Sequence, residues 1–341
     1  PGAQGQGEGP GQRQDRGAES SGRQLGPSQT DFVCALSAGD RGGQIVAFTR
    51  VEQRVVGQSS WRDDPRDFAL PEPLGQPRVL HLLADGRSAA GACDVAEACD
   101  GVIHAAFEYS KRGESVDRQA LEALLPVMRR RQAGAGTKAP FFIYTSGSWV
   151  IGKATKPAAE DTPLNPTPLV AWRPAHERLV LDAGADGSIR PVVVRPGIVY
   201  GGARGIIADL VKEASNGLVR VIGSGKQHWP CIYDRDLADL YVRVSTMNDA
   251  SGIFHANDEA DESVDDIVAA ISQHAKMAPD VRHMPIEEAR KKMGAYADAL
   301  ALDQIVRSPR ARALGWAPTL RSVARSVARL LEEFRTARAA A

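Results

Sequence analysis

The chain has 341 residues, and its 42 basic residues are balanced by 42 acidic ones, so the formal net charge is zero. This balance gives no electrostatic reason to expect nucleic-acid or membrane binding, and no apolar run approaches the roughly 20 residues of a membrane-spanning helix. The four cysteines lack CxxC spacing and zinc-type histidine partners, which predicts no metal site and favours a reduced, cytoplasmic setting.

The first third of the chain gives mixed signals. Residues 1–29 carry almost no large apolar side chains, so we expect a disordered extension that cannot bury enough surface to offset its ordering entropy. A short helix is predicted at 31–36. Strands are predicted at 44–50 and 78–83, separated by a loop rich in Pro, Asp and Arg.

From residue 99 onward, strands and helices alternate. Strands are predicted at 101–106, 141–145 and 191–196, and helices at 117–131 and 174–182. The first helix carries an apolar stripe, although Pro126 should weaken or kink it. A second apolar stripe predicts a last helix around 320–334. This alternation predicts an α/β fold, a Rossmann-like doubly wound parallel sheet with crossover helices on both faces.

Five segments, in the right order, resemble the extended branch of the short-chain dehydrogenase/reductase superfamily, the NAD-dependent epimerase/dehydratase family. They are VIHAAF at 102–107, IYTSGSWVIG at 143–152, VVVRPGIVYGG at 192–202, CIYDRDLADLYVRV at 231–244 and LGWAPT at 314–319. The resemblance implies a Rossmann-like nucleotide-binding part at 30–200, degenerate over 30–98, and a smaller C-terminal substrate lobe at 201–341. Within that lobe, 231–245 would return to the sheet.

The expected phosphate-binding turn is doubtful. A Rossmann unit needs glycines after its first strand, but no strand here is followed by GxxGxxG. Gly39 and Gly42 have the spacing of the first two glycines of this motif, but Ile45 occupies the position of the third. Residues 41–50 resemble the family's second strand, which would place Arg50 against the 2′-phosphate of NADP and put NADP slightly ahead of NAD. A solvated surface arginine is the alternative.

The resemblance also assigns residues to the cofactor site. They are His104, Ala105, Ser146, Arg195 and Pro196.

The family's catalytic Tyr-x-x-x-Lys pair is missing. One register places Leu169 and Arg173 at the two positions, and the other places Trp172 and His176 there. The serine turn is shifted as well. Gly147 occupies the usual serine place, with Ser146 and Ser148 beside it.

The remaining groups allow other chemistry. His176 could act as a general acid or base, kept neutral near a helix N-terminus, or could be a surface histidine. Arg173 could hold an anion or oxyanion, and Ser146 or Ser148 could bind a substrate carbonyl. Tyr200 could donate to the substrate or simply pack.

Two acidic residues raise a further question. Asp234 and Asp236 suggest a helix start rather than a metal pair.

These observations leave two classes of function open. The first is an NAD(P)-dependent oxidoreductase or epimerase/dehydratase-like enzyme acting on a small carbonyl or sugar-type substrate. The second is a catalytically silent dinucleotide-binding or protein-interaction module. The only partner expected is a small-molecule substrate, with a homodimer left open.

Overall fold

The computed structural model describes residues 34–39, 42–45, 78–79, 96, 100–107, 110–130, 139–276 and 278–339. The predicted disordered extension and Arg50 lie outside these residues. So do the loop expected near 58–76 and most of the two strands expected at 44–50 and 78–83.

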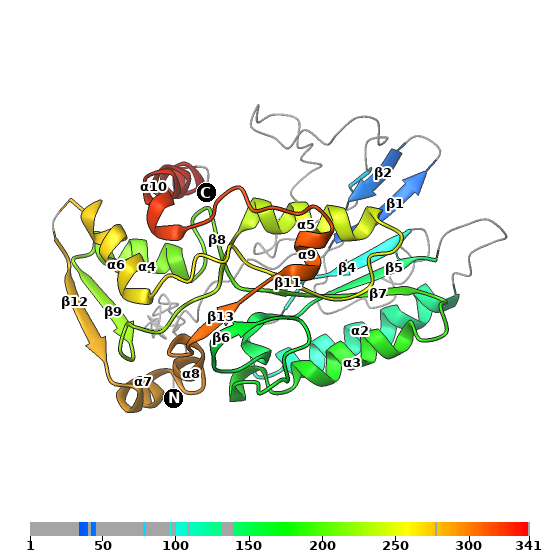
Figure 1. Ribbon diagram of the computed structural model, residues 1–341, viewed down its shortest axis with the longest axis horizontal. Helices are drawn as coiled ribbons and strands as arrows, with labels where there is room; N and C mark the ends of the chain where they lie inside the picture. Colours follow the sequence, from blue (N-terminus) through cyan, green and yellow to red (C-terminus); the bar gives the residue numbers. More distant parts are fainter. Residues whose placement is uncertain are drawn as a thin grey trace, which may run out of the picture.

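A seven-stranded sheet forms the centre of the protein, in the order β11-β7-β5-β4-β1-β2, with β3 beside β1 (Figure 1). Its strands are β1 (Cys34–Gly39), β2 (Gly42–Ile45), β3 (Arg78–Val79), β4 (Gly101–His104), β5 (Phe141–Thr145), β7 (Arg190–Pro196) and β11 (Gly252–Ala256). The ladders β4–β5, β5–β7 and β7–β11 are parallel, which confirms the predicted Rossmann-like sheet. The helix predicted at 31–36 is wrong where the structure describes it, because Cys34, Ala35 and Leu36 pair with β4 and tertiary pairing overrides local preference.

Strand β1 runs against the direction of the parallel strands. It pairs antiparallel with β4, with Leu36 opposite Gly101, and then turns into β2 where Gly39 pairs with Gly42. The Gly39–Gly42 pair therefore lies beyond the amino end of β4. In parallel α/β sheets, ligands bind at the carboxyl ends of the strands. These two glycines are thus at the opposite edge from a nucleotide site.

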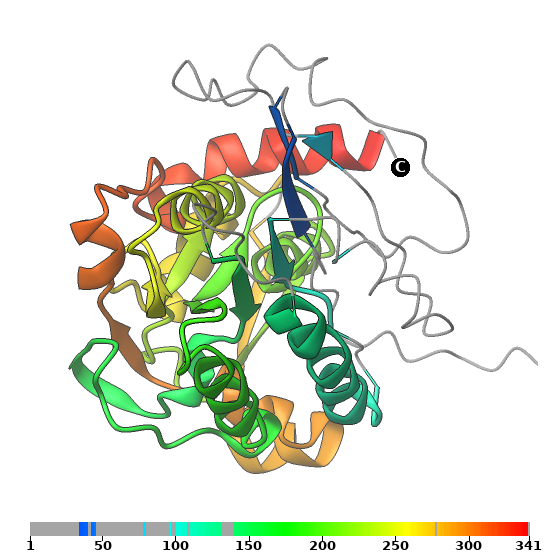
Figure 2. The same ribbon diagram turned by 90° about the vertical axis from the view of Figure 1, so that its right-hand side faces the viewer.

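Helices cover both faces of the sheet. α2 (Gly113–Arg130) and α3 (Arg173–Ala183) lie side by side on one face, and α5 (Asp234–Thr246) lies on the other (Figures 1 and 2). Helix α2 begins earlier than predicted and continues through Pro126, whose side chain is exposed. Its buried stripe packs on the sheet, so tertiary contacts outweigh the hydrogen bond that proline removes.

The C-terminal part adds three two-stranded sheets and several helices. The sheets pair β8 (Ile198–Tyr200) with β10 (Cys231–Tyr233), β9 (Leu218–Ile222) with β12 (Asp280–Met284), and β6 (Ala154–Ala158) with β13 (Gln304–Val306). The helices are α4 (Ile206–Ser215), α6 (Val264–Gln273), α7 (Ile286–Met293), α8 (Tyr296–Leu300), α9 (Pro309–Ala313) and α10 (Val323–Ala339). Two 3₁₀ turns, η1 (Ser148–Val150) and η2 (Pro168–Val170), precede α3.

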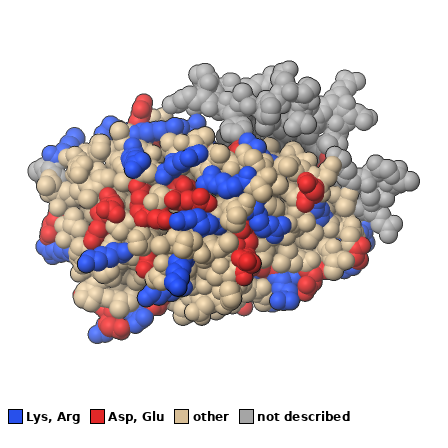
Figure 3. Space-filling view, viewed as in Figure 1, with Lys and Arg blue, Asp and Glu red and all other residues tan. Residues whose placement is uncertain are grey.

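The predicted last helix is confirmed as α10. Four residues of its apolar stripe are buried against α4 and α6, namely Val323, Val327, Leu330 and Phe334. Figure 3 shows acidic and basic side chains intermixed over the face viewed. Within the described part of the chain, no helix combines the length and apolar character needed to cross a membrane.

Candidate active site

Polar side chains form a buried row at the carboxyl ends of the parallel strands. His104 on β4 pairs with Tyr144 on β5, and Arg195 on β7 pairs with His255 on β11. Paired residues on neighbouring parallel strands point to the same face of a sheet. All four side chains are almost fully buried, so each of their polar groups needs a partner within the protein. The partners come mainly from α2 and α3.

Asp117 of α2 is the centre of the first cluster. Its carboxylate accepts hydrogen bonds from His104 Nε2 at 3.0 Å, from the Tyr144 hydroxyl at 2.8 Å and from His176 Nδ1 at 2.7 Å. Burial raises the pKa of Asp117, but the bonds from the two histidines and the charge of Arg173 outweigh it and hold that pKa well below its usual range. Asp117 is therefore an anion that can only accept hydrogen bonds.

The charge state of Asp117 determines how the His176 ring is protonated. Because the carboxylate can only accept, His176 must carry a proton on Nδ1, and in the neutral imidazole Nε2 is then a lone-pair acceptor. His176 is completely buried, so the surface-histidine interpretation is wrong. Its Nε2 has no hydrogen-bond partner among the described residues. An oriented, unpartnered imidazole nitrogen is the group that general acid–base catalysis requires.

Arg173 lies at the start of α3, between aromatic rings. Its Nη1 donates to the Thr145 carbonyl at 3.0 Å, and its guanidinium lies over the rings of Phe107 and Trp172, 5.0 and 4.5 Å from their centroids. Trp172 stacks on Phe107 and meets the His176 ring edge-on, with centroids 5.6 and 4.8 Å apart. The partly exposed Trp172 therefore covers one side of His176.

A second buried cluster ties α3 to β7. Arg195 donates to both carboxylate oxygens of Glu177, from Nε at 3.0 Å and from Nη2 at 2.6 Å, while its Nη1 has no partner among the described residues. Beside it, His255 Nδ1 donates to the Arg307 carbonyl at 3.1 Å. Burial, and then the charge of Arg195, lowers the pKa of His255 to about 3, so this ring is neutral at physiological pH.

The serine turn follows β5 directly. The Ser146 amide donates to the Val194 carbonyl at 2.8 Å, and its buried hydroxyl has no partner in the part of the chain that the structure describes. Ser148 opens η1, and its carbonyl accepts from Gln304 Nε2 at 2.8 Å. Of the other predicted cofactor residues, Ala105 is partly exposed after β4, and Pro196 is buried at the end of β7. The Ser146 hydroxyl is thus a buried donor available to a ligand.

Tyr200 lies apart from these groups. It ends β8 in the core of the C-terminal part, its ring packs on Tyr233, and its hydroxyl reaches Asp258 and the Leu320 carbonyl at 3.4 Å each. Burial raises the pKa of Tyr200 far above its ordinary value. None of its hydrogen bonds reaches the serine turn or α3.

The two acidic residues weighed as a metal pair lie at the start of α5. Asp234 and Asp236 are both in its first turn, and Asp236 accepts from the Thr319 hydroxyl and the Leu320 amide. The described residues contain no cluster of three or more metal-type ligands.

Sequence reasoning missed Asp117, Tyr144, Glu177 and His255. One signal was present for Asp117, which occupies a buried position on the same face of α2 as Leu121 and Leu125. A charged residue in an apolar stripe needs buried partners, and those partners are histidines from distant segments. Tyr144 and His255 stand in buried strands, where the sequence alone gives no reason to single them out.

Comparison with known proteins agrees with this architecture. The sequence model of the NAD-dependent epimerase/dehydratase family matches residues 64–256, more than half of the chain. The chain belongs to the NAD-dependent epimerase/dehydratase family. This family match begins after the Gly39–Gly42 hairpin, so it does not include the antiparallel strand β1.

Individual relatives extend the comparison. An uncharacterized protein of Schizosaccharomyces pombe, C2A9.02, is 30% identical over 230 residues, covering 65% of this chain and 74% of the relative. Among solved structures, dTDP-glucose 4,6-dehydratase DesIV from Streptomyces venezuelae is 19% identical with a TM-score of 0.63, covering 77% of this chain and 82% of DesIV. UDP-glucose 4-epimerase from Thermus thermophilus is also 19% identical, with a TM-score of 0.62, covering 78% of this chain and 86% of the epimerase. These two structures support the fold.

Proposed function

We propose that this protein is an NAD(P)-dependent oxidoreductase or epimerase/dehydratase-like enzyme acting on a sugar-type or small carbonyl substrate. The observation that carries the proposal is the Asp117–His176 pair, which orients a free imidazole nitrogen at the helix that holds the family's catalytic residues. The family match supports the reaction class. The substrate class draws on DesIV and the Thermus epimerase, each named for a nucleotide-linked glucose and each solved with NAD.

The described residues fit one side of a dinucleotide. The free Ser146 hydroxyl and the free Arg195 N–H are buried donors at the carboxyl ends of β5 and β7, where a nicotinamide would lie. Ala105 and Pro196 would line the same site. The pyrophosphate side does not fit as well, because β1 is antiparallel and brings no glycine turn to this edge of the large sheet. We therefore expect weaker binding than a complete glycine turn would give.

The chain's own groups would handle the proton. A bound nicotinamide would supply the hydride acceptor, while His176 Nε2 would take the proton of a substrate hydroxyl and return it in the reverse direction. Asp117 would stabilise the resulting imidazolium through its 2.7 Å bond. Ser146 Oγ would donate to the developing carbonyl oxygen. Since Trp172 covers one side of His176, the substrate would displace this ring or approach past it.

Turnover measurements test this function. Purified protein would be incubated with NAD⁺ or NADP⁺ and with UDP-glucose or dTDP-glucose, with products followed by NMR and reduced cofactor by absorbance. We expect turnover, and His176→Gln should lower kcat by about 10²- to 10⁴-fold. His274→Gln is the control, because His274 is exposed on the surface. Folded His176→Gln protein with full turnover would contradict the proposed role.

A pair of charge-conserving arginine variants tests whether the position and shape of the Arg173 guanidinium matter. Arg173→Lys should reduce kcat, because lysine cannot reproduce the planar contacts with Phe107 and Trp172. Arg178→Lys, on the exposed face of α3, should leave kcat unchanged. Because both changes keep the positive charge, equal effects would indicate that the planar contacts of Arg173 do not contribute to turnover.

The second candidate is a catalytically silent dinucleotide-binding or interaction module. It is favoured by one observation, the complete burial of His176 under Trp172 in a helix without the catalytic tyrosine. Titration with NADH and NADPH, followed by cofactor fluorescence, distinguishes the two. Binding without turnover on any nucleotide sugar would support the silent module.

Three further expectations stay predictions. They are a homodimer, a cytoplasmic location, and a division into a nucleotide-binding part at 30–200 and a substrate lobe at 201–341.

A further inference from the structure

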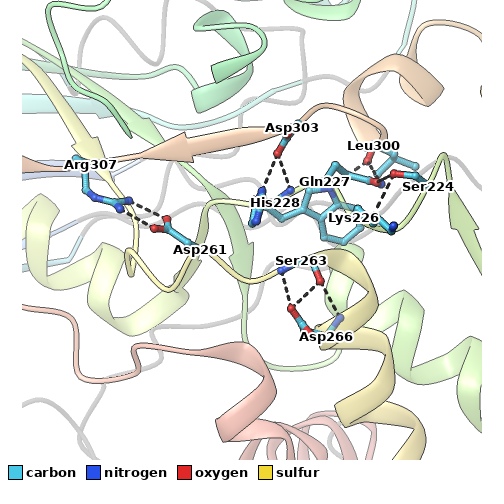
Figure 4. Close-up of polar contacts among 11 residues, drawn as sticks. Ser224, Lys226, Gln227, His228, Asp261, Ser263, Asp266, Leu300, Asp303 and Arg307 are labelled. Carbon is cyan, nitrogen blue, oxygen red and sulfur yellow. Dashed lines mark hydrogen bonds and ion pairs between the residues drawn. The ribbon is translucent and has the colours of Figure 1, made fainter. Parts of the chain in front are cut away.

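A separate pocket of about 370 Å³ lies in the C-terminal part of the molecule. It is bounded by the turn after β9, by α7, and by the segment that joins α8 to β13. Figure 4 shows Ser224, Lys226 and Gln227 of the turn close to Leu300 and Asp303. The polar and charged residues that line it are Lys153, Ser224, Lys226, Gln227, Arg290, Asp298 and Asp303. It shares no residue with the Asp117–His176 cluster.

The pocket has an excess of positive charge, because its lining contains Lys153, Lys226 and Arg290 but only two carboxylates. Both carboxylates in its lining already have partners: Asp298 pairs with Arg290 at 2.6 Å, and Asp303 accepts from the His228 ring and backbone at 2.8 and 2.9 Å. Lys153 and Lys226 have no ion pair within the described part of the chain, and both side chains are exposed. The pocket therefore offers an anion two ammonium groups that no carboxylate contacts at ion-pair distance, although Lys153 interacts electrostatically with Asp303.

The turn after β9 adds backbone donors. Gly223 and Gly225 have φ of +81° and +75°, while Ser224 between them has a negative φ. Turns of this kind aim successive amides into an anion-binding concavity. The amides of Ser224 and Gly225 donate to no group that the structure describes.

The turn is held rigidly. A Cβ at Gly225 would lie 1.9 Å from Asp265 Oδ1, so only glycine fits there, and the Asp265 amide donates to the Gly225 carbonyl at 2.9 Å. The Asp265 carboxylate is itself paired with His283 at 2.8 Å. Behind the turn, the buried Gln227 donates to the Ile222 carbonyl at 2.7 Å. The site is thus formed before any ligand binds, which lowers the entropic cost of binding.

We infer that this pocket binds a phosphate group, either free or carried by a small metabolite. Lys153 and Lys226 supply the charge, and the Ser224 and Gly225 amides supply directed donors. The Ser224 hydroxyl would exchange its 3.5 Å bond to Gln227 Oε1 for one to the anion. The volume falls within the range of small-molecule sites. The inference does not depend on the proposed catalytic function.

Isothermal titration calorimetry with inorganic phosphate, glucose 6-phosphate and glucose tests the inference. Wild-type protein should bind at least one of the two phosphorylated probes and should not bind glucose. The double variant Lys153→Gln/Lys226→Gln should bind at least about tenfold more weakly, the loss expected for one charge-assisted hydrogen bond. Lys156→Gln is the matched control, because Lys156 is an exposed lysine of the neighbouring strand β6 outside the pocket.

The outcomes distinguish free phosphate from a phosphorylated metabolite. They also distinguish this pocket from the proposed catalytic site. Tighter binding of glucose 6-phosphate than of phosphate would indicate a phosphorylated metabolite, and equal binding would indicate the free ion. His176→Gln should leave the affinity unchanged, which separates this site from the proposed catalytic one. The inference is overturned if neither phosphorylated probe binds at about 1 mM, or if the double variant binds as tightly as the wild type.

Discussion

The two faces of the parallel strands bury different kinds of side chain, although most of the side chains on both faces are almost fully buried. Toward α5 the face is largely apolar, and Ile143, Val194 and Phe254 pack against Leu237 and Leu240. A polar contact at its carboxyl ends is the 2.7 Å hydrogen bond between the hydroxyls of Thr145 and Tyr241. Toward α2 and α3, the strands end in imidazole, phenol and guanidinium groups. Those groups form hydrogen bonds with the buried carboxylates of Asp117 and Glu177.

This difference indicates that the apolar face stabilises the fold, whereas the polar face serves a site. Burying apolar surface stabilises by roughly 25 cal/mol per Å², whereas a buried ion pair seldom recovers the cost of removing two charges from water. Stability alone would favour apolar residues on both faces. The polar face is therefore best explained by the chemistry of its groups, and each prediction below contrasts it with the apolar face or with exposed residues.

The largest expected loss of stability follows from breaking the buried pair. Glu177→Ala would leave the Arg195 guanidinium, only 2% exposed, without its carboxylate. We expect the free energy of unfolding to fall by about 3–5 kcal/mol in urea denaturation. Glu122→Ala removes an exposed ion pair with Arg118 on the same helix, and it should change the free energy of unfolding by less than about 1 kcal/mol. Equal effects would show that burial of the pair is unimportant.

A slightly smaller loss is expected on the apolar face. Leu240→Ala would leave a cavity where α5 packs on the sheet, because Leu240 is completely buried. The free energy of unfolding should fall by about 2–5 kcal/mol. The polar cluster should be unaffected, so any cofactor binding should survive in the folded fraction. Loss of cofactor affinity in folded Leu240→Ala protein would contradict the claim that the apolar face contributes only to stability.

Acid titration gives the smallest effect per unit of the variable that is changed, here the pH. The pKa of His255 is lowered to about 3 by burial and then by Arg195, so between about pH 6.5 and 3 the unfolded chain binds a proton that the folded protein does not. His255 therefore stabilises the fold above pH 6.5, and this contribution is lost as the pH falls through that window. His255→Gln should reduce the slope of stability against pH by up to about 1.4 kcal/mol per pH unit. The exposed control His274→Gln should keep the wild-type slope.

Local pattern predicted much of the fold but little of the site. The parallel strands β4, β5 and β7, with α3 and α10, follow from runs of apolar residues and helical spacing, which are properties of short segments. Strand β11 was not predicted. The direction of β1 depends on pairing with β4, more than 60 residues away, and no local signal specifies it. The Asp117–His176 contact likewise joins residues 59 apart. His176 and Arg173 were singled out from their place in the resemblance, while their orienting partners came only from the fold.

The protonation of the His176 ring tests the central claim most directly, because it requires neither substrate nor cofactor. Long-range ¹H–¹⁵N NMR of protein labelled at its seven histidines would be assigned with His176→Gln. If Asp117 orients His176 for proton transfer, Nδ1 carries the proton and Nε2 does not, and Asp117→Asn disturbs this arrangement. A proton held on Nε2 with a bare Nδ1 would contradict the account.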